Sequence, residues 1–274
     1  MNDMSLKAKI RNISKEKNIS AQSVLQNYLM NRFLYRLSLS EYKEKFIIKG
    51  GMLISSIIGI EHRATMDIDT TLKNLMLEKE EIIRAFNAIC ATPTDDGINF
   101  SFDSIVPIRG DDEYGGYRLS FTAIFGKIHA PMSMDISTGD VITPSAELHL
   151  FYDMFDKDIY FNLWAYPIET ILAEKIETIL SRGIDNTRPR DFYDVYKLMG
   201  YGCNKKIFKK AFEATALHRE SLEKIINYEE IINSIADSLV MSRRWNEYVR
   251  QMPYACGISF FDTLESVRKL LDLT

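Results

Sequence analysis

The chain has 274 residues, of which 46% are hydrophobic and 26% charged, and its net charge of −4 excludes a uniformly basic nucleic-acid-coating protein. Its three widely spaced cysteines form neither a disulfide framework nor a zinc-binding pattern. The Lys/Asn/Ser-rich start lacks the apolar core of a signal peptide, and no apolar run reaches the roughly 18 residues of a membrane span. We therefore expect a cytoplasmic monomer without membrane association.

Two helices are predicted at the start of the chain. Residues 4–18 alternate lysines with apolar positions, which predicts a short exposed helix. Ser20 is a typical N-cap for a second helix, whose apolar positions recur three and four residues apart. Arg32 and Arg36 lie one turn apart on that helix. They are interpreted as surface or ion-pair residues, with phosphate contact as the alternative.

The stretch Lys49–Thr70 carries the strongest chemical signal. A strand (Phe46–Ile48) leads through Gly50-Gly51 into a helix (Met52–Gly59), and a second strand (Ala64–Thr70) follows. A glycine turn at a helix N-terminus favours phosphate binding. Asp67 and Asp69 alternate with Met66 and Ile68, so both carboxylates should share one face while the apolar pair faces the core. This combination suits Mg²⁺-dependent phosphoryl or nucleotidyl transfer, and a solvated strand edge is the alternative.

The region 46–165 is predicted to form a mixed sheet with helices. Glu78–Ala91 has a helical pattern, with Ile82, Ile83, Phe86 and Ile89 facing inward. Three strands follow, at Gly97–Ile108, Tyr117–Phe125 and Ile128–Ser137, and the first two are separated by the turn GDDEYGG at 110–116. Asp135 falls on the polar face of the last strand. It is a candidate third metal ligand, or else an ordinary edge-strand aspartate.

From Pro167 onward the periodicity is helical. Pro167 suits a first helical turn and Gly183 suits a stop. Lys175 falls inside the apolar stripe of this helix, so it must extend to solvent, find a buried partner or serve the reaction. In the next helix, DFYDVYKLMG, Asp191 and Asp194 share one flank at a spacing of three residues.

Basic residues gather in the last third of the chain. Lys205, Lys206, Lys209 and Lys210 form one cluster, and Arg243, Arg244 and Arg250 form another, with Trp245 and Tyr248 between them. Such clusters are solvated faces or contacts to structured RNA. The change from sheet to helix places the domain boundary near 166, giving domains at 1–165 and 166–274.

Four segments in order, KGGMLISSIIGIEHRATMDIDT, MDISTGD, YPIETILAEKIETILSRG and RPRDFYDVYKL, resemble the AbiEii/AbiGii family of abortive-infection toxins. The resemblance runs from about Tyr35 to Met199. It implies an α/β (α+β) nucleotidyltransferase fold with a mixed sheet and flanking helices, followed by a mainly helical C-terminal domain. Members act as toxins in bacterial toxin–antitoxin pairs, and some resemble transferases that add nucleotides to the tRNA acceptor end.

The resemblance also implies roles for particular residues. The glycine turn falls on Gly50-Gly51, the paired metal carboxylates on Asp67 and Asp69, and the third strand carboxylate on Asp135. Lys175 would neutralise phosphate charge while Asp191 or Asp194 holds it in place. Gly51 stands where many relatives have serine, so a hydroxyl near the phosphates is missing. Lys49 and Arg63, which flank the same loop, are further candidates for phosphate contact.

The implied activity is Mg²⁺-dependent transfer from a nucleoside triphosphate (NTP) to RNA, with tRNA as the expected acceptor and a separately encoded antitoxin as partner. Asp69→Ala or Lys175→Ala should then abolish transfer while leaving the fold intact. Two alternatives stay open. The acceptor could instead be a protein or antibiotic hydroxyl, or the chain could be a catalytically silent module that binds nucleic acid or a partner.

Overall fold

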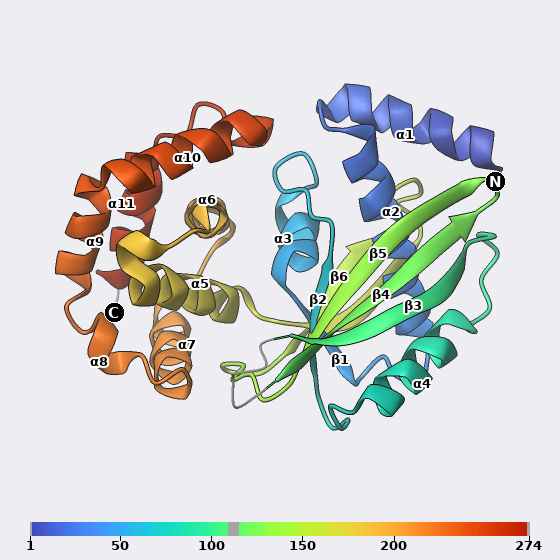
Figure 1. Ribbon diagram of the computed structural model, residues 1–274, viewed down its shortest axis with the longest axis horizontal. Helices are drawn as coiled ribbons and strands as arrows, with labels where there is room; N and C mark the ends of the chain where they lie inside the picture. Colours follow the sequence, from blue (N-terminus) through green and yellow to red (C-terminus); the bar gives the residue numbers. More distant parts are fainter. Residues whose placement is uncertain (1, 109–114, 273–274) are drawn as a thin grey trace. The chain divides into compact units, whose positions relative to one another are not determined.

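The computed structural model describes residues 2–108 and 115–272, and seven strands of these residues form one mixed sheet (Figure 1). The strands are β1 (Phe46–Lys49), β2 (Ile68–Leu72), β3 (Asn99–Ile108), β4 (Gly116–Phe125), β5 (Ile128–Ser137), β6 (Glu147–Tyr152) and β7 (Tyr160–Ala165). Their order is β3-β4-β5-β2-β1-β7-β6. The β2–β5 and β1–β7 pairs are parallel, and the other neighbours are antiparallel.

Helices cover one face of the sheet. The helices of this region are α1 (Asp3–Lys17), α2 (Ala21–Leu39), α3 (Gly50–Ile58) and α4 (Lys79–Cys90). Phe33 of α2 and Phe86 of α4 pack on Phe121 of β4, with ring centroids 5.0 and 5.2 Å apart. These contacts place the aromatic core between the helices and β3–β5. The predicted helix at 78–91 and the three predicted strands are confirmed, although Ile83 is only half-buried.

The opposite face of the sheet carries polar side chains. In β4, Leu119, Phe121 and Ala123 are buried, and they alternate with Arg118, Ser120 and Thr122, which are less buried. In β5 the buried Met132, Met134 and Ile136 alternate in the same way with Ser133, Asp135 and Ser137. The period of two therefore sends Asp135 to the polar face, as predicted.

Two predictions for the sheet are wrong. Strand β2 begins at Ile68 rather than Ala64, and Asp67 lies in a bend before it. Met66 is 49% exposed instead of facing the core. The physical reason is pairing: β1 ends at Lys49, opposite Asp69, so residues 64–67 have no β1 partner. The β6–β7 hairpin was not predicted, and residues 110–114 of the expected turn lie outside the described part of the chain.

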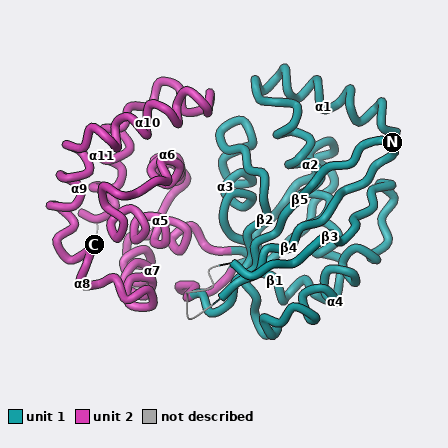
Figure 2. Tube along the Cα trace, viewed as in Figure 1, with its two compact units in different colours: residues 1–140, 147–165 teal, residues 141–146, 166–274 magenta. Residues whose placement is uncertain are grey.

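The chain divides into two compact units (Figure 2). Unit 1 comprises residues 1–140 and 147–165 and contains the sheet with α1–α4. Unit 2 comprises residues 141–146 and 166–274 and is helical. Residues 141–146 belong with the helices because Thr143 exchanges hydrogen bonds with Thr170 in both directions, at 3.1 and 2.9 Å.

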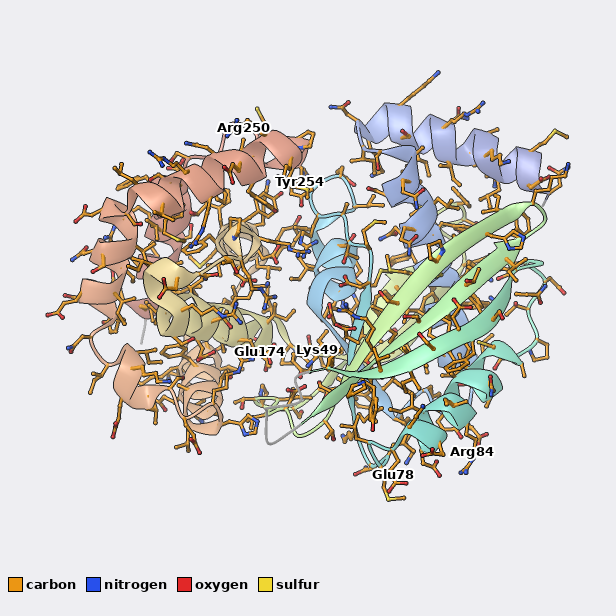
Figure 3. All side chains as sticks on the ribbon, in the orientation of Figure 1. Lys49, Glu78, Arg84, Glu174, Arg250 and Tyr254 are labelled. Atoms are coloured by element: carbon orange, nitrogen blue, oxygen red, sulfur yellow. The ribbon has the colours of Figure 1, made fainter. Side chains whose placement is uncertain are left out.

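The helices of unit 2 are α5 (Ile168–Arg182), α6 (Pro189–Leu198), α7 (Lys205–His218), α8 (Leu222–Ile225), α9 (Tyr228–Asp237), α10 (Leu239–Gln251) and α11 (Phe260–Leu271). Pro167 precedes α5, and Gly183, with φ of +51°, ends it. Trp245 packs on Phe260 and Tyr248, and Tyr193 packs on Tyr254, which Figure 3 labels. Trp245 and Tyr248 therefore belong to the core and do not offer the surface stacking that an RNA contact would need. None of the described helices is long and apolar enough to cross a membrane.

Candidate active site

Four charged side chains form a row across the polar face of the sheet. Strand register pairs Lys49 with Asp69, Asp69 with Asp135, and Asp135 with Arg118. Because register partners on neighbouring strands project to the same face, the four side chains stand side by side. We call these four residues the charged row; Figure 3 labels Lys49 at its β1 end. Lys49, Asp69 and Asp135 were predicted from the sequence, and Arg118 was not.

The Gly50 turn and Asp69 depend on each other. Gly50 has φ of +64°, and a Cβ atom there would lie 1.9 Å from Asp69 Oδ2. Only glycine fits such a close approach without strain. The Gly51 N–H donates to Asp69 Oδ2 at 3.2 Å, so the carboxylate binds the N-terminus of α3. The amide expected to contact phosphate is thus bonded to Asp69 here.

Thr65 supplies a hydroxyl next to Gly51. A Cβ atom at position 51 would lie 2.4 Å from Thr65 Oγ1, so a serine could not enter without displacing that side chain. Thr65 Oγ1 donates to Asp67 Oδ1 at 2.8 Å. The hydroxyl that Gly51 lacks is therefore present nearby, on a residue that no sequence pattern marked. Arg63 lies at the same turn, almost fully buried, and donates to the Ala64 carbonyl.

Negative charge is in excess around Asp69. The pKa of Asp69 is raised, and burial is the largest cause. The charge of Asp67 raises it further, and Asp135 makes a smaller contribution. The Gly51 N–H and the Lys49 ammonium oppose these effects only in part. Three carboxylates this close cannot all ionise comfortably without an added cation.

Both cations of the charged row are already in ion pairs. Lys49 Nζ contacts Asp140 and donates to Ser137 Oγ at 2.8 Å. Although burial acts in the other direction, this ammonium lowers the pKa of Asp140. At the other end, Arg118 Nε and Nη2 each donate to one oxygen of Asp135 at 2.7 Å. Asp140 was also missed by sequence reasoning. It follows β5, and its partner Lys49 is 91 residues away in the sequence.

The carboxylates are suited to a metal ion that binds together with substrate phosphates. Within the described part of the chain, they do not form a complete metal site made of protein ligands alone. Among residues 2–108 and 115–272, no three His, Cys, Asp or Glu side chains are grouped to hold a metal ion. Mg²⁺ is usually bound by one or two carboxylates together with water and substrate phosphates. Asp69 and Asp135, side by side with excess negative charge around them, provide that donor set.

Two cavities of unit 1 differ in chemistry. The larger, of about 610 Å³, is lined by Tyr28, Arg32, Asp96, Asp153 and Phe155, among others. Its buried charges neutralise one another, since Arg32 pairs with Asp96 and Asp153. Arg36 also pairs with Asp96, at 2.6 Å, so the ion-pair interpretation of both arginines is confirmed. The smaller cavity, of about 40 Å³, is bordered by Lys49, Asp69, Asp135 and Ser137, and we place the site there.

A second charged cluster lies inside unit 2. Lys175 Nζ is 2.7 Å from Asp191 Oδ1 and 2.8 Å from Asp194 Oδ2. Burial would lower the pKa of Lys175, but the two carboxylates raise it overall. Arg188 also contacts Asp191, at 3.2 Å. The sequence expected one aspartate to hold Lys175, and both do so, joining α5 to α6.

Carboxylates in register on adjacent strands, next to a glycine turn that opens a helix, are an arrangement suited to phosphate chemistry. The family follows from comparison with known proteins. The model of the family described as "Nucleotidyl transferase AbiEii toxin, Type IV TA system" matches residues 32–265. The chain belongs to this family, as its motifs indicated, and is a nucleotidyltransferase of a toxin–antitoxin system.

Two solved structures from Helicobacter pylori share the fold. JHP933 from Helicobacter pylori is 16% identical, with a TM-score of 0.51 over 92% of this chain and 93% of that one. A putative nucleotidyltransferase from H. pylori is also 16% identical, with a TM-score of 0.50 over 93% and 99%. An antigenic nucleotidyltransferase-like protein from Paracoccidioides brasiliensis is 13% identical, with a TM-score of 0.43 over 88% and 93%. None of the curated proteins matches the chain.

Proposed function

We propose that the chain transfers a nucleotide from an NTP to the 3′-terminal hydroxyl of an RNA of the tRNA class, with Mg²⁺ held by Asp69 and Asp135 together with the substrate phosphates, and with Asp67 adding negative charge beside them. The observation that carries the proposal is the register pairing of Asp69 with Asp135, directly beside the Gly51 N–H. The separate antitoxin that the family name implies would act in the same cytoplasmic compartment.

The reaction needs a charge-neutralised triphosphate and a place for one proton. Bound Mg²⁺ supplies neutralisation of the phosphate oxygens. The acceptor hydroxyl oxygen forms a bond to the α-phosphorus, and the bond from that phosphorus to the β-phosphate oxygen breaks. Pyrophosphate leaves with the bonding electrons, and Asp135 takes the hydroxyl proton. Asp69 is fixed for its role by Gly51, and Asp67 by Thr65.

Positive groups would bind the phosphates. The N-terminus of α3, Lys49 and Arg63 are the candidates in unit 1. In unit 2, Asp191 and Asp194 fix the ammonium group of Lys175, and we keep this lysine as a candidate for phosphate binding. Electrostatic stabilisation of this kind supplies much of the rate in phosphoryl transfer.

Exposed basic residues of unit 2 support an RNA acceptor. They lie on α7 and α10, and are Lys205, Lys206, Lys209, Lys210, Arg243 and Arg250. Lysine and arginine contacts to phosphates release counterions, which makes such binding depend on salt concentration. A small-molecule acceptor would show no such dependence on these residues.

The test is transfer of label from each of the four α-labelled NTPs to total bacterial RNA, protein and small molecules, with Mg²⁺ or with EDTA. We expect a tRNA-sized, EDTA-sensitive product. Asp69→Asn should lower the rate by about a thousandfold, or about 4 kcal/mol, because it removes a metal ligand while an amide oxygen can still accept from Gly51. Asp103→Asn is the matched control, since Asp103 is exposed on β3 and bonded to Thr122 of the same sheet.

Each outcome has a clear meaning. Label in protein or small molecules would replace the RNA acceptor and leave the chemistry standing. Full activity of Asp69→Asn would overturn the assigned site. Silence with all four NTPs from folded protein, together with no Mg²⁺-dependent nucleotide binding, would make the chain a binding module.

A further inference from the structure

Arg118 is bonded to the Asp135 carboxylate, which a metal at this site would need as a ligand. Its Nε and Nη2 donate to Asp135 Oδ1 and Oδ2, both at 2.7 Å, so each oxygen accepts from the guanidinium. The two residues are register partners on β4 and β5, so the pairing follows from the sheet itself and not from a flexible loop. Asp69, which is the other half of the donor set, is the register partner of Asp135 on its far side.

Charges of the site favour this pairing when no metal is bound. Asp135 contributes most to raising the pKa of Arg118, and Asp67 and Asp69 also raise it. The guanidinium therefore balances part of the negative charge of Asp135, Asp67 and Asp69. Yet the Arg118 side chain is 47% exposed, and an ion pair in that position contributes little to stability because water competes for both groups. Such a pair can form and be displaced.

We propose that Arg118 is a latch on the metal site: it holds Asp135 while the site lacks a metal, and releases it when Mg²⁺ enters with the NTP. The released guanidinium binds the triphosphate, because its planar set of donors matches phosphate oxygens. Metal binding and nucleotide binding are then coupled, and metal alone binds weakly. This inference rests on the proposed function of the site and adds its regulation.

The test measures binding of Mn²⁺, as a substitute for Mg²⁺, without nucleotide and without turnover, from the electron paramagnetic resonance signal of the free ion. Arg118→Gln should bind Mn²⁺ about two- to fivefold more tightly than the wild type, since the competing ion pair is gone. It should also bind a non-hydrolysable NTP analogue more weakly in the presence of Mn²⁺. Arg84→Gln is the matched control, because Arg84 lies on α4 and pairs with Glu81 away from the charged row (Figure 3).

Arg118→Lys separates a latch from simple charge repulsion. Lysine keeps the positive charge but cannot bond both oxygens in the same planar arrangement. A latch requires Arg118→Lys to bind Mn²⁺ more tightly than the wild type, whereas repulsion alone would leave it unchanged and overturn the inference. The Asp135→Asn/Arg118→Gln double variant should show no gain over Asp135→Asn.

The inference and the proposed function can fail separately. If the wild type binds Mn²⁺ with nucleotide and loses it in Asp69→Asn, while Arg118→Gln has no effect, only the latch fails. If the wild type binds no Mn²⁺ even with nucleotide, the metal-dependent function fails as well.

Discussion

The charged row of unit 1 and the Lys175 cluster of unit 2 use the same residue types but differ in charge balance. Around the row, the carboxylates of Asp67, Asp69, Asp135 and Asp140 outnumber the cations, which are Lys49, Arg118 and the buried Arg63 at the Gly51 turn. In unit 2, Asp191 and Asp194 are balanced by Lys175 and Arg188. Excess negative charge calls for a ligand cation, whereas a balanced cluster is complete by itself.

Burial separates the two regions further. Asp194 is fully buried and Asp191 nearly so, whereas the Asp135 side chain of the row is 21% exposed; the outer cation of each region, Arg188 or Arg118, is about half-exposed. A buried, balanced cluster fixes the geometry of two helices. A partly exposed row with excess charge can exchange its partners. The contrast shows that a buried ionic group is not by itself evidence of catalysis.

Removing Lys175 is the strongest test of whether its cluster stabilises the fold. Lys175→Ala leaves two buried carboxylates without their ammonium, and we expect the free energy of unfolding to fall by about 3–5 kcal/mol. The contacts therefore change the earlier expectation that this variant keeps its fold. Urea unfolding monitored by tryptophan fluorescence measures the loss.

A triple variant separates structure from reaction. Lys175→Met with Asp191→Asn and Asp194→Asn removes all three charges together, so most of the lost stability should return. If Lys175 serves the reaction, this folded variant still fails to transfer nucleotide. An active triple variant would show that the cluster acts only through the fold.

Gly50→Ala tests whether the position of Asp69 in the charged row matters for transfer. Its Cβ would lie 1.9 Å from Asp69 Oδ2, and φ of +64° is unfavourable for alanine. We expect a loss of about 1–2 kcal/mol of stability. Transfer should fall about a hundredfold, because Asp69 must move by a large fraction of an ångström.

The control for this variant is Gly200→Ala, where the added Cβ has no atom within 4 Å. Thermal unfolding and the transfer assay together give the result. Normal transfer by Gly50→Ala would mean that the position of Asp69 does not matter for the reaction.

The smallest effect concerns a balanced cluster in unit 1. Burial opposes ionisation of Asp96, but hydrogen bonds from Arg36, the Ile98 N–H and Arg32 lower its pKa from 3.8 to about 2. A lowered folded-state pKa adds stability above the unfolded value and loses it as the pH falls from about 4 to about 2. Asp96→Asn should cost about 1–2 kcal/mol at pH 7, allowing for solvent screening.

This cost should shrink as the pH falls through the same window, because the wild type loses its ionised Asp96. Chemical unfolding at several pH values measures the difference between the two proteins. A constant difference from pH 7 to pH 2 would contradict the lowered pKa of Asp96 as the source of the stability.

Local pattern determined much of the fold. The alternation of Met132, Met134 and Ile136 with polar residues is a property of neighbouring positions, so it placed Asp135 on the polar face without knowledge of the sheet. Ser20 and Gly183 mark helix ends through their own backbone and side-chain preferences. The motifs around Gly50, Asp69 and Lys175 likewise indicated the family.

Pairing between distant segments decided the rest. Arg118 entered the site because β4 pairs with β5 in one register, and Asp140 because it meets Lys49 at the end of β1. The start of β2 at Ile68 depends on where β1 ends, and the β6–β7 hairpin owes its place to the pairing of β7 with β1. Sequence alone determined which residues could act, since chemistry belongs to side chains. The tertiary structure decided which charges are balanced, since balance depends on neighbours that are distant in the chain.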